Sequence, residues 1–289
     1  MTSIFHIYHI CKVNFLKWKN NHRIIVISGL LVIFLHFLTK DLLAESMQSN
    51  LPVAPWLFPF LFNHRYYKLL FFIPLIILFC DAPFVDETYH YSIIRSSRFK
   101  WCVGQLLYII SASIVYFIFI FILSVVFCIL NINWTLDWGT FLGTAANTSF
   151  GNNLTLNISS KIVNCLTPTY TTFITLLLCS LNGMIIGSLI FLSNLIRLPR
   201  FVGVISAISL LLFDTMCVTH GQKNLYYYSP VTWTTISCLD LNNRTDLPSI
   251  EYAVVAGSLL LFVLLFFILI LCRNKSLSLL YKNRRYSYE

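Results

Sequence analysis

The chain has 289 residues, of which 57% are hydrophobic and 11% are charged, and its formal net charge is +9. A soluble domain carries about 25% charged residues, so it has no means of hiding this much apolar surface from water. The composition therefore excludes an ordinary soluble fold and predicts an integral membrane protein.

Residues 1–23 predict an amphipathic helix lying on the inner membrane surface. The apolar positions recur at steps of three and four residues: Ile4, Ile7, Tyr8, Cys11, Phe15 and Trp18. Polar and basic residues mostly stand between them, as they do in helices that lie in a bilayer interface. The stretch lacks the short apolar core and the small-residue cleavage site of a secretory signal.

Six apolar runs follow, and each is long enough for a helix that crosses a bilayer core, which takes about 20 residues. They cover residues 24–43, 66–84, 103–130, 170–195, 201–219 and 252–272. The second run is the weakest, because it is continuously apolar only over 69–80. Helices alone satisfy the backbone of a single apolar run in lipid. The sequence thus predicts one domain over 1–289, an all-α polytopic transmembrane bundle of about six spans.

The distribution of basic residues predicts the orientation. Of the 20 Lys and Arg residues, 14 lie on one side of the predicted spans: Lys12, Lys17, Lys19, Arg23, Arg95, Arg98, Lys100, Arg197, Arg200, Arg273, Lys275, Lys282, Arg284 and Arg285. The richer side is the cytoplasmic one. We therefore expect a multi-pass protein of the cell membrane with both termini in the cytoplasm and a basic tail at 273–289. Attraction to anionic lipid headgroups explains the basic excess, so no nucleic-acid partner is expected.

Two long loops are predicted on the outer side. Residues 131–168 are rich in Asn, Thr, Ser and Gly, and loops of this length are usually functional or disordered. Residues 221–249 carry aromatic residues beside the bilayer, which indicates either a segment that dips back into the outer interface or an ordinary aromatic belt. Among nine cysteines without a C-x-x-C pair, Cys165 and Cys238 are the one pair predicted to share the oxidising side, and whether they bond stays open.

The cytoplasmic link between the second and third spans predicts a short helix. Pro83 suits a first helical turn, and acidic residues near the start and basic residues near the end complement the helix dipole. Val85, Tyr89 and Ile93 repeat at four-residue steps and form one face for a soluble partner or the bilayer.

At this link the chain resembles a known family. The relevant stretches are LFCDAPFVDETYHYSIIRSSRFKWCVGQLLYIISASIVYFIFIFILSVV, then DWGTF and YYYSPVTWTTISCLD. They resemble the membrane permease subunits of type-2 ATP-binding-cassette exporters of low-GC Gram-positive bacteria. The resemblance covers most of the chain as an order of features: an interfacial N-terminal helix, two spans, a cytosolic link with a basic end, four more spans, and a loop that dips back before the last one.

The resemblance implies a mechanism in which this chain supplies no chemistry. Such permeases pair with a second copy or a homologue, and each docks a separate ATPase, so ATP enters through a partner and the chain itself holds no cofactor. The helix that receives the push of the ATPase would lie within 83–98. Its expected coupling residues are Phe84, Val85, Tyr89, Ile93, Arg95 and Arg98.

Polar residues inside the spans are the candidates for a translocation path, because a charge in lipid is costly and usually faces a cavity or a partner. Asp214 lies in the outer half of the fifth span and His36 in the outer half of the first. A structural role for Asp214 and an interfacial position for His36 near Lys40 are the open alternatives. Gly183 and Gly187 form a G-x-x-x-G pattern that favours close packing of helices within the molecule.

Other functions are weighed against this one. The chain has neither the G-x-x-x-x-G-K-[ST] loop of an ATPase nor an H-E-x-x-H pattern, so no catalytic residues are expected. No ligand set for a metal is expected either. A non-transporting membrane immunity or sensor protein, whose outer loops would bind a peptide, remains the alternative.

Overall fold

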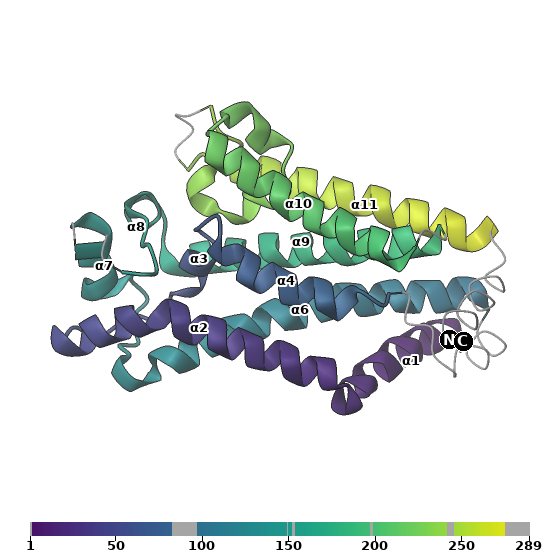
Figure 1. Cartoon of the computed structure of the whole chain (residues 1–289), viewed down its shortest axis with the longest axis horizontal. Helices are drawn as coiled ribbons and strands as arrows, with labels where there is room; N and C mark the ends of the chain where they lie inside the picture. Colours follow the sequence, from purple (N-terminus) through teal and green to yellow (C-terminus); the bar gives the residue numbers. More distant parts are fainter. Residues whose placement is uncertain are drawn as a thin grey trace.

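The computed structural model describes residues 2–82, 97–148, 150–151, 154–196, 199–241 and 246–274. These residues form an all-α bundle, which confirms the predicted fold class (Figure 1). The helices are α1 (Thr2–Leu16), α2 (His22–Gln48), α3 (Phe58–Leu61), α4 (Tyr67–Phe79), α6 (Arg98–Cys128), α7 (Gly139–Asn147), α8 (Ser160–Cys165), α9 (Pro168–Leu195), α10 (Arg200–His220) and α11 (Ile250–Asn274). Short 3-10 turns are η1 (Lys17–Asn20), η2 (Ile129–Asn131), η4 (Lys223–Tyr227), η5 (Thr232–Thr234) and η6 (Ile236–Cys238).

Five of the described helices, α2, α6, α9, α10 and α11, are long and apolar enough to cross a membrane. Large apolar side chains on the outside of the bundle, such as Leu259 and Phe262 of α11 and Met216 of α10, are more than half exposed. A soluble protein rarely leaves such continuous apolar surface in water. The protein is therefore a membrane protein whose exposed helix faces are suited to lipid.

The weakest predicted span, 66–84, corresponds to a shorter helix. Helix α4 has 13 residues, which at 1.5 Å per residue span about 20 Å, less than the roughly 30 Å of a bilayer core. The apolar segment just before it, 51–62, is almost entirely buried and holds the one-turn helix α3. Irregular backbone at this depth is tolerated where protein surrounds it. The sequence pattern did not predict this buried segment.

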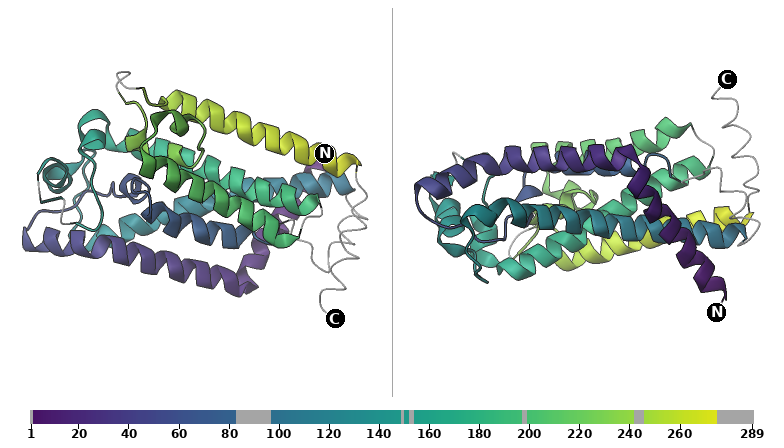
Figure 2. Two further views of the ribbon diagram at one scale, coloured as in Figure 1. Left: turned by 45° about the horizontal axis from the view of Figure 1, so that its top comes forward. Right: turned by 90° about the horizontal axis from the view of Figure 1, so that it is seen from below.

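The bundle has two distinct ends. Helices α2, α4, α6, α9, α10 and α11 run side by side along the long axis in alternating directions (Figures 1 and 2). At one end lie α7, α8 and the segments 49–66, 221–241 and 246–249, and we call it the loop end. At the other lie α1, the start of α6 and the end of α11, and we call it the terminal end. Which end faces the cytoplasm stays a prediction from the distribution of basic residues.

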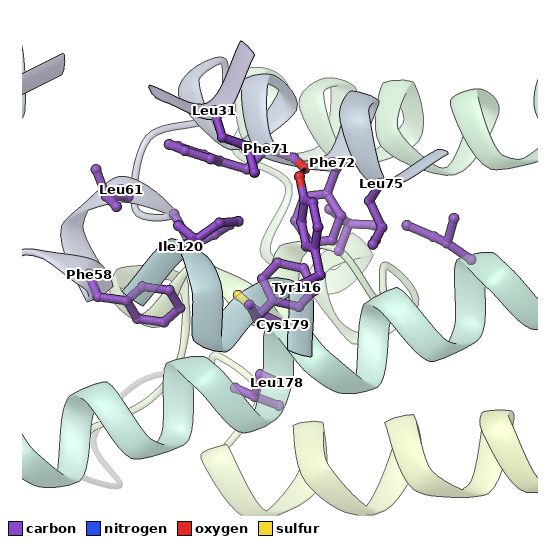
Figure 3. Close-up of a cluster of buried hydrophobic side chains, with 14 of the residues drawn as sticks. Leu31, Phe58, Leu61, Phe71, Phe72, Leu75, Tyr116, Ile120, Leu178 and Cys179 are labelled. Carbon is purple, nitrogen blue, oxygen red and sulfur yellow. Dashed lines mark hydrogen bonds between the residues drawn. The ribbon is translucent and has the colours of Figure 1, made fainter. Parts of the chain in front are cut away.

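Helix α9 forms the centre of the bundle, and its two glycines explain how. A Cβ atom on Gly183 would lie 3.0 Å from Phe117, and one on Gly187 would lie 2.6 Å from Ile109. Both neighbours belong to α6, so the glycines let α9 approach α6 closely, as predicted for packing within the molecule. Around this contact the aromatic core joins α4 to α6: the Tyr116 hydroxyl donates to the Phe71 carbonyl at 2.6 Å (Figure 3).

The N-terminal helix differs in part from the single surface stripe that was predicted. Helix α1 packs along the first half of α6, where Gly104 leaves room for Ile10. The buried Asn14 amide donates to Gln105 at 2.8 Å, and the Trp18 indole donates to Tyr108 at 2.7 Å.

The apolar surface of α1 is therefore divided between protein and exterior. Cys11 is buried, whereas Ile4, Phe5 and Tyr8, nearer the start of the helix, are exposed. One side of the N-terminal segment packs on protein because α6 provides a glycine and two polar partners there.

The structure answers the question of cysteine pairing that the sequence left open. Cys165 and Cys238 form no disulfide with each other. The disulfide in the described part of the chain joins Cys102 of α6 to Cys272 of α11. Sequence spacing did not indicate this pair, because 170 residues separate its members and the folding of the bundle alone brings them together.

Candidate functional site

The loop end of the bundle contains a fully buried ion pair. Lys68, in the first turn of α4, places its Nζ 2.7 Å from the carboxylate of Asp214, which lies in the last third of α10. Both side chains have 0% exposure. The pair joins two helices that are 146 residues apart in the sequence.

Two threonines complete the first layer around these charges. The Thr232 hydroxyl donates to Asp214 Oδ1 at 2.8 Å, and Lys68 Nζ donates to the Thr235 hydroxyl oxygen at 2.9 Å. The Thr235 hydroxyl also lies 3.2 Å from the Phe62 carbonyl, to which it donates. The site thus ties together α4, α10, the 3-10 turns of 229–238 and the buried segment 51–62.

Further contacts hold the loop over the pair. The Ser237 backbone N–H donates to Asn63 at 3.2 Å. Lys161 of α8 donates to the carbonyls of Ser237 and Leu239 at 2.9 and 2.6 Å. Partial burial lowers the pKa of the Lys161 ammonium. The loop after α10, for which a segment dipping into the lipid interface and an ordinary aromatic belt were both open, packs on protein here, with Trp233 buried next to Gly257 of α11.

The burial of both charges makes the free energy of the pair depend on its geometry. Removing two charges from water is expensive, and their mutual attraction offsets that cost only with close geometry and extra hydrogen bonds. Here the two threonines supply those bonds. Asp214 Oδ2 is close to Lys68 Nζ but lies outside hydrogen-bond geometry, so one carboxylate oxygen lacks a hydrogen bond among the described residues. A site of this kind is held together mainly by the pairing itself.

Two cysteines, Cys217 and Cys238, lie close enough to Lys68 and Asp214 for the charges of the pair to act on their thiols. Burial raises the pKa of the Cys238 thiol above its usual range. Among the described residues, no group of three or more His, Cys, Asp and Glu side chains is placed to hold a metal ion. The arrangement provides an electrostatic contact between α4 and α10 that can break and form again.

Comparison with protein-family models, with curated proteins and with solved structures gives no match to this chain. A function is therefore inferred from the residues of this chain alone. The buried Lys68–Asp214 pair is the most informative of them.

The structure places the residues predicted from the sequence in different regions. Asp214 lies in the buried pair. His36 is exposed on the outside of α2, its ring centroid 6.2 Å from that of Phe127, and it is not part of the site. Arg98 is exposed at the first turn of α6, at the terminal end. The remaining coupling residues lie outside the described residues: Phe84, Val85, Tyr89, Ile93 and Arg95.

Sequence reasoning missed Lys68, Thr232 and Thr235. Lys68 was counted among the charges of the outer interface, since it stands at the edge of the weakest apolar run. A signal was present: a lysine and an aspartate at similar depth in two spans are natural partners in lipid. The threonines carried no such signal, because their loop read as a segment outside the bundle.

Proposed function

We propose that this chain is the membrane permease subunit of an ATP-driven exporter of the type-2 ATP-binding-cassette class. In this proposal it forms the translocation path and docks a separate ATPase through residues 83–98. The observation that carries the proposal is the Lys68–Asp214 pair. Ionisable residues inside membrane bundles are rare and often mark substrate or ion pathways, and a buried ion pair is weak evidence for a stabilising role.

The pair would act as a closure at the loop end. Lys68 belongs to α4 and Asp214 to α10, so separating these helices breaks the pair and releases the loop that Thr232 and Thr235 hold down. An outward-open state would expose both charges to water, which lowers the cost of separating them. The loop end then closes again when the two charges lose their water and form the pair once more.

Helix α9 supplies polar groups that a path needs. Ser180, Asn182 and Ser188 are at most 4% exposed, yet the two serine hydroxyls and the Asn182 carbonyl oxygen have no hydrogen-bond partner among the described residues. Buried polar atoms are normally paired, so unpaired ones along a central helix are suited to a state in which water or substrate reaches them.

The anchoring of the chain on both sides of 83–96 supports the coupling part of the proposal. On one side, Asp81 pairs with Arg23 of α2, and the Ala82 carbonyl accepts a hydrogen bond from Asn194 of α9. On the other side, Arg98 begins α6 directly. A push on the link would therefore reach α2, α4, α6 and α9 together.

A second candidate is a non-transporting immunity or sensor protein. The observation that favours it is the built surface at the loop end, where α7 and α8 are folded and Lys161 fastens α8 to the loop that follows α10. A protein that binds a peptide from outside needs such a surface. The same surface is compatible with an exporter, whereas the buried pair has no evident purpose in a sensor.

Affinity purification in a mild detergent tests the proposal. We expect an ATPase with a phosphate loop to co-purify with the wild-type chain, and we expect the Tyr89→Ala/Ile93→Ala variant to lose it while keeping its membrane topology. The matched control is Tyr66→Ala/Ile73→Ala, which removes the same residue types from exposed positions on or beside α4. Retention of the ATPase by the first variant would contradict the coupling assignment, and absence of an ATPase from the wild-type purification would favour the sensor.

A further inference from the structure

The disulfide at the terminal end is placed where a permanent bond is unexpected. Cys102 lies in the second turn of α6 and Cys272 in the last turn of α11, with a Cα–Cα distance of 6.6 Å, within the range that disulfides adopt. Their exposed fractions are 0% and 2%.

The basic residues place this end in the cytoplasm under the orientation proposed above. There, glutathione and thioredoxin keep thiols reduced, and the disulfides that do form are mostly transient or redox-sensing. A pair that the fold brings into bonding position on that side is therefore suited to cycling between two states.

We propose that Cys102 and Cys272 form a reversible thiol–disulfide site that fastens the start of α6 to the end of α11. The oxidant is a low-molecular-weight disulfide. One cysteine thiolate attacks it and forms a mixed disulfide, releasing one small thiol. The second cysteine thiolate then displaces the other small thiol. Two protein thiols become one protein disulfide, and one small disulfide becomes two small thiols, so protons and electrons balance.

The position of the bond gives it a mechanical consequence. The first turns of α6 are already held on one side by α1, through the Asn14–Gln105 hydrogen bond and the close approach of Ile10 to Gly104. The disulfide adds a covalent restraint from α11 on the same stretch. In the oxidised form, the start of α6 is fixed between two helices. In the reduced form, only non-covalent packing holds the start of α6.

Thiol trapping in isolated membranes tests this site without any transport assay. Membranes are treated with dithiothreitol, then with oxidised glutathione, then again with dithiothreitol. At each step the protein is denatured in N-ethylmaleimide, digested and measured by mass spectrometry. We expect the linked 102–272 peptides after oxidised glutathione and their loss after each dithiothreitol treatment. The Cys102→Ser variant controls for other linkages, and no 165–238 link is expected.

Two outcomes overturn the proposal. The absence of a 102–272 link after oxidation means that the thiols do not form the site. A link that survives dithiothreitol in the membrane, and breaks only after denaturation, means a structural bond.

A separate labelling step distinguishes failure of the site from failure of the orientation. The exposed Cys165 lies at the loop end, so a membrane-impermeant maleimide added to intact cells should label it. Lack of labelling, with labelling restored in broken cells, would overturn the orientation and with it the cytoplasmic argument for reversibility. The peptide measurement would still report on the bond itself.

Discussion

Two ion pairs stand at opposite ends of the bundle, and they differ in burial. Lys68 and Asp214 at the loop end are fully buried, whereas the side chains of Arg23 and Asp81 at the terminal end are 50% and 40% exposed. The exposed pair is screened by water and contributes little to stability. Water does not solvate the buried pair, so the stabilisation of each charge depends on the other. The same chemistry thus makes a weak, solvated pair at one end and a buried pair of mutually dependent charges at the other.

The largest effect is expected from removing one buried charge. Asp214→Asn keeps the side-chain size but leaves the Lys68 ammonium buried without a counter-charge, so we predict a loss of about 3–5 kcal/mol of unfolding free energy. Denaturant unfolding in detergent measures this loss. The double variant Lys68→Met/Asp214→Leu should recover most of it, since it leaves no unpaired charge. A double variant as unstable as the single one would contradict the pairing account.

A smaller effect is expected from the hydroxyls around the pair. Thr235→Val removes a hydrogen bond to the charged Lys68 and should cost about 1.5–3 kcal/mol in the same measurement. Thr234→Val is the matched control: its hydroxyl is also buried but bonds only the Val231 carbonyl, a neutral partner, for which about 1 kcal/mol is expected. Equal losses in the two variants would mean that Thr235 does not act through the charge.

The smallest effect is expected at the terminal end. Arg23→Ala removes the exposed pair with Asp81 and should lower the unfolding free energy by at most about 1 kcal/mol. The difference from wild type should shrink further in 1 M salt, where screening is strong. A loss comparable to that of Asp214→Asn, unaffected by salt, would erase the distinction between the two ends.

The fold class followed from the sequence because lipid imposes one structure on long apolar runs. Helices α9 and α11 lie close to their predicted runs for this reason, and Gly183 showed its packing role in advance. The candidate site could not be predicted from the sequence in the same way. Lys68 stands next to a tyrosine pair at the edge of a short run, and its depth depends on how 51–62 packs. Such tertiary packing leaves no periodic signal.

The loops show the same limit. Residues 131–168 read as a polar loop, yet they contain α7 and α8. Asn147 of α7 and Asn164 of α8 donate to each other, at 3.4 and 3.0 Å, and no spacing rule predicts a contact of this kind. In both α7 and α8, tertiary contacts override a weak local helix propensity.

The central claim is that the buried pair closes the loop end and opens when ATP binds to the partner. Ser229 lies in the same loop with 0% exposure and an unpartnered hydroxyl among the described residues, so Ser229→Cys is a small change that reports opening. In a chain whose Cys165, Cys217 and Cys238 are serine, the labelling rate of this cysteine by an impermeant maleimide is measured in the purified complex with its ATPase. The account predicts slow labelling without nucleotide and labelling at least about tenfold faster, or 1.4 kcal/mol, once ATP and vanadate trap the closed ATPase. Equal rates in the two states would contradict it.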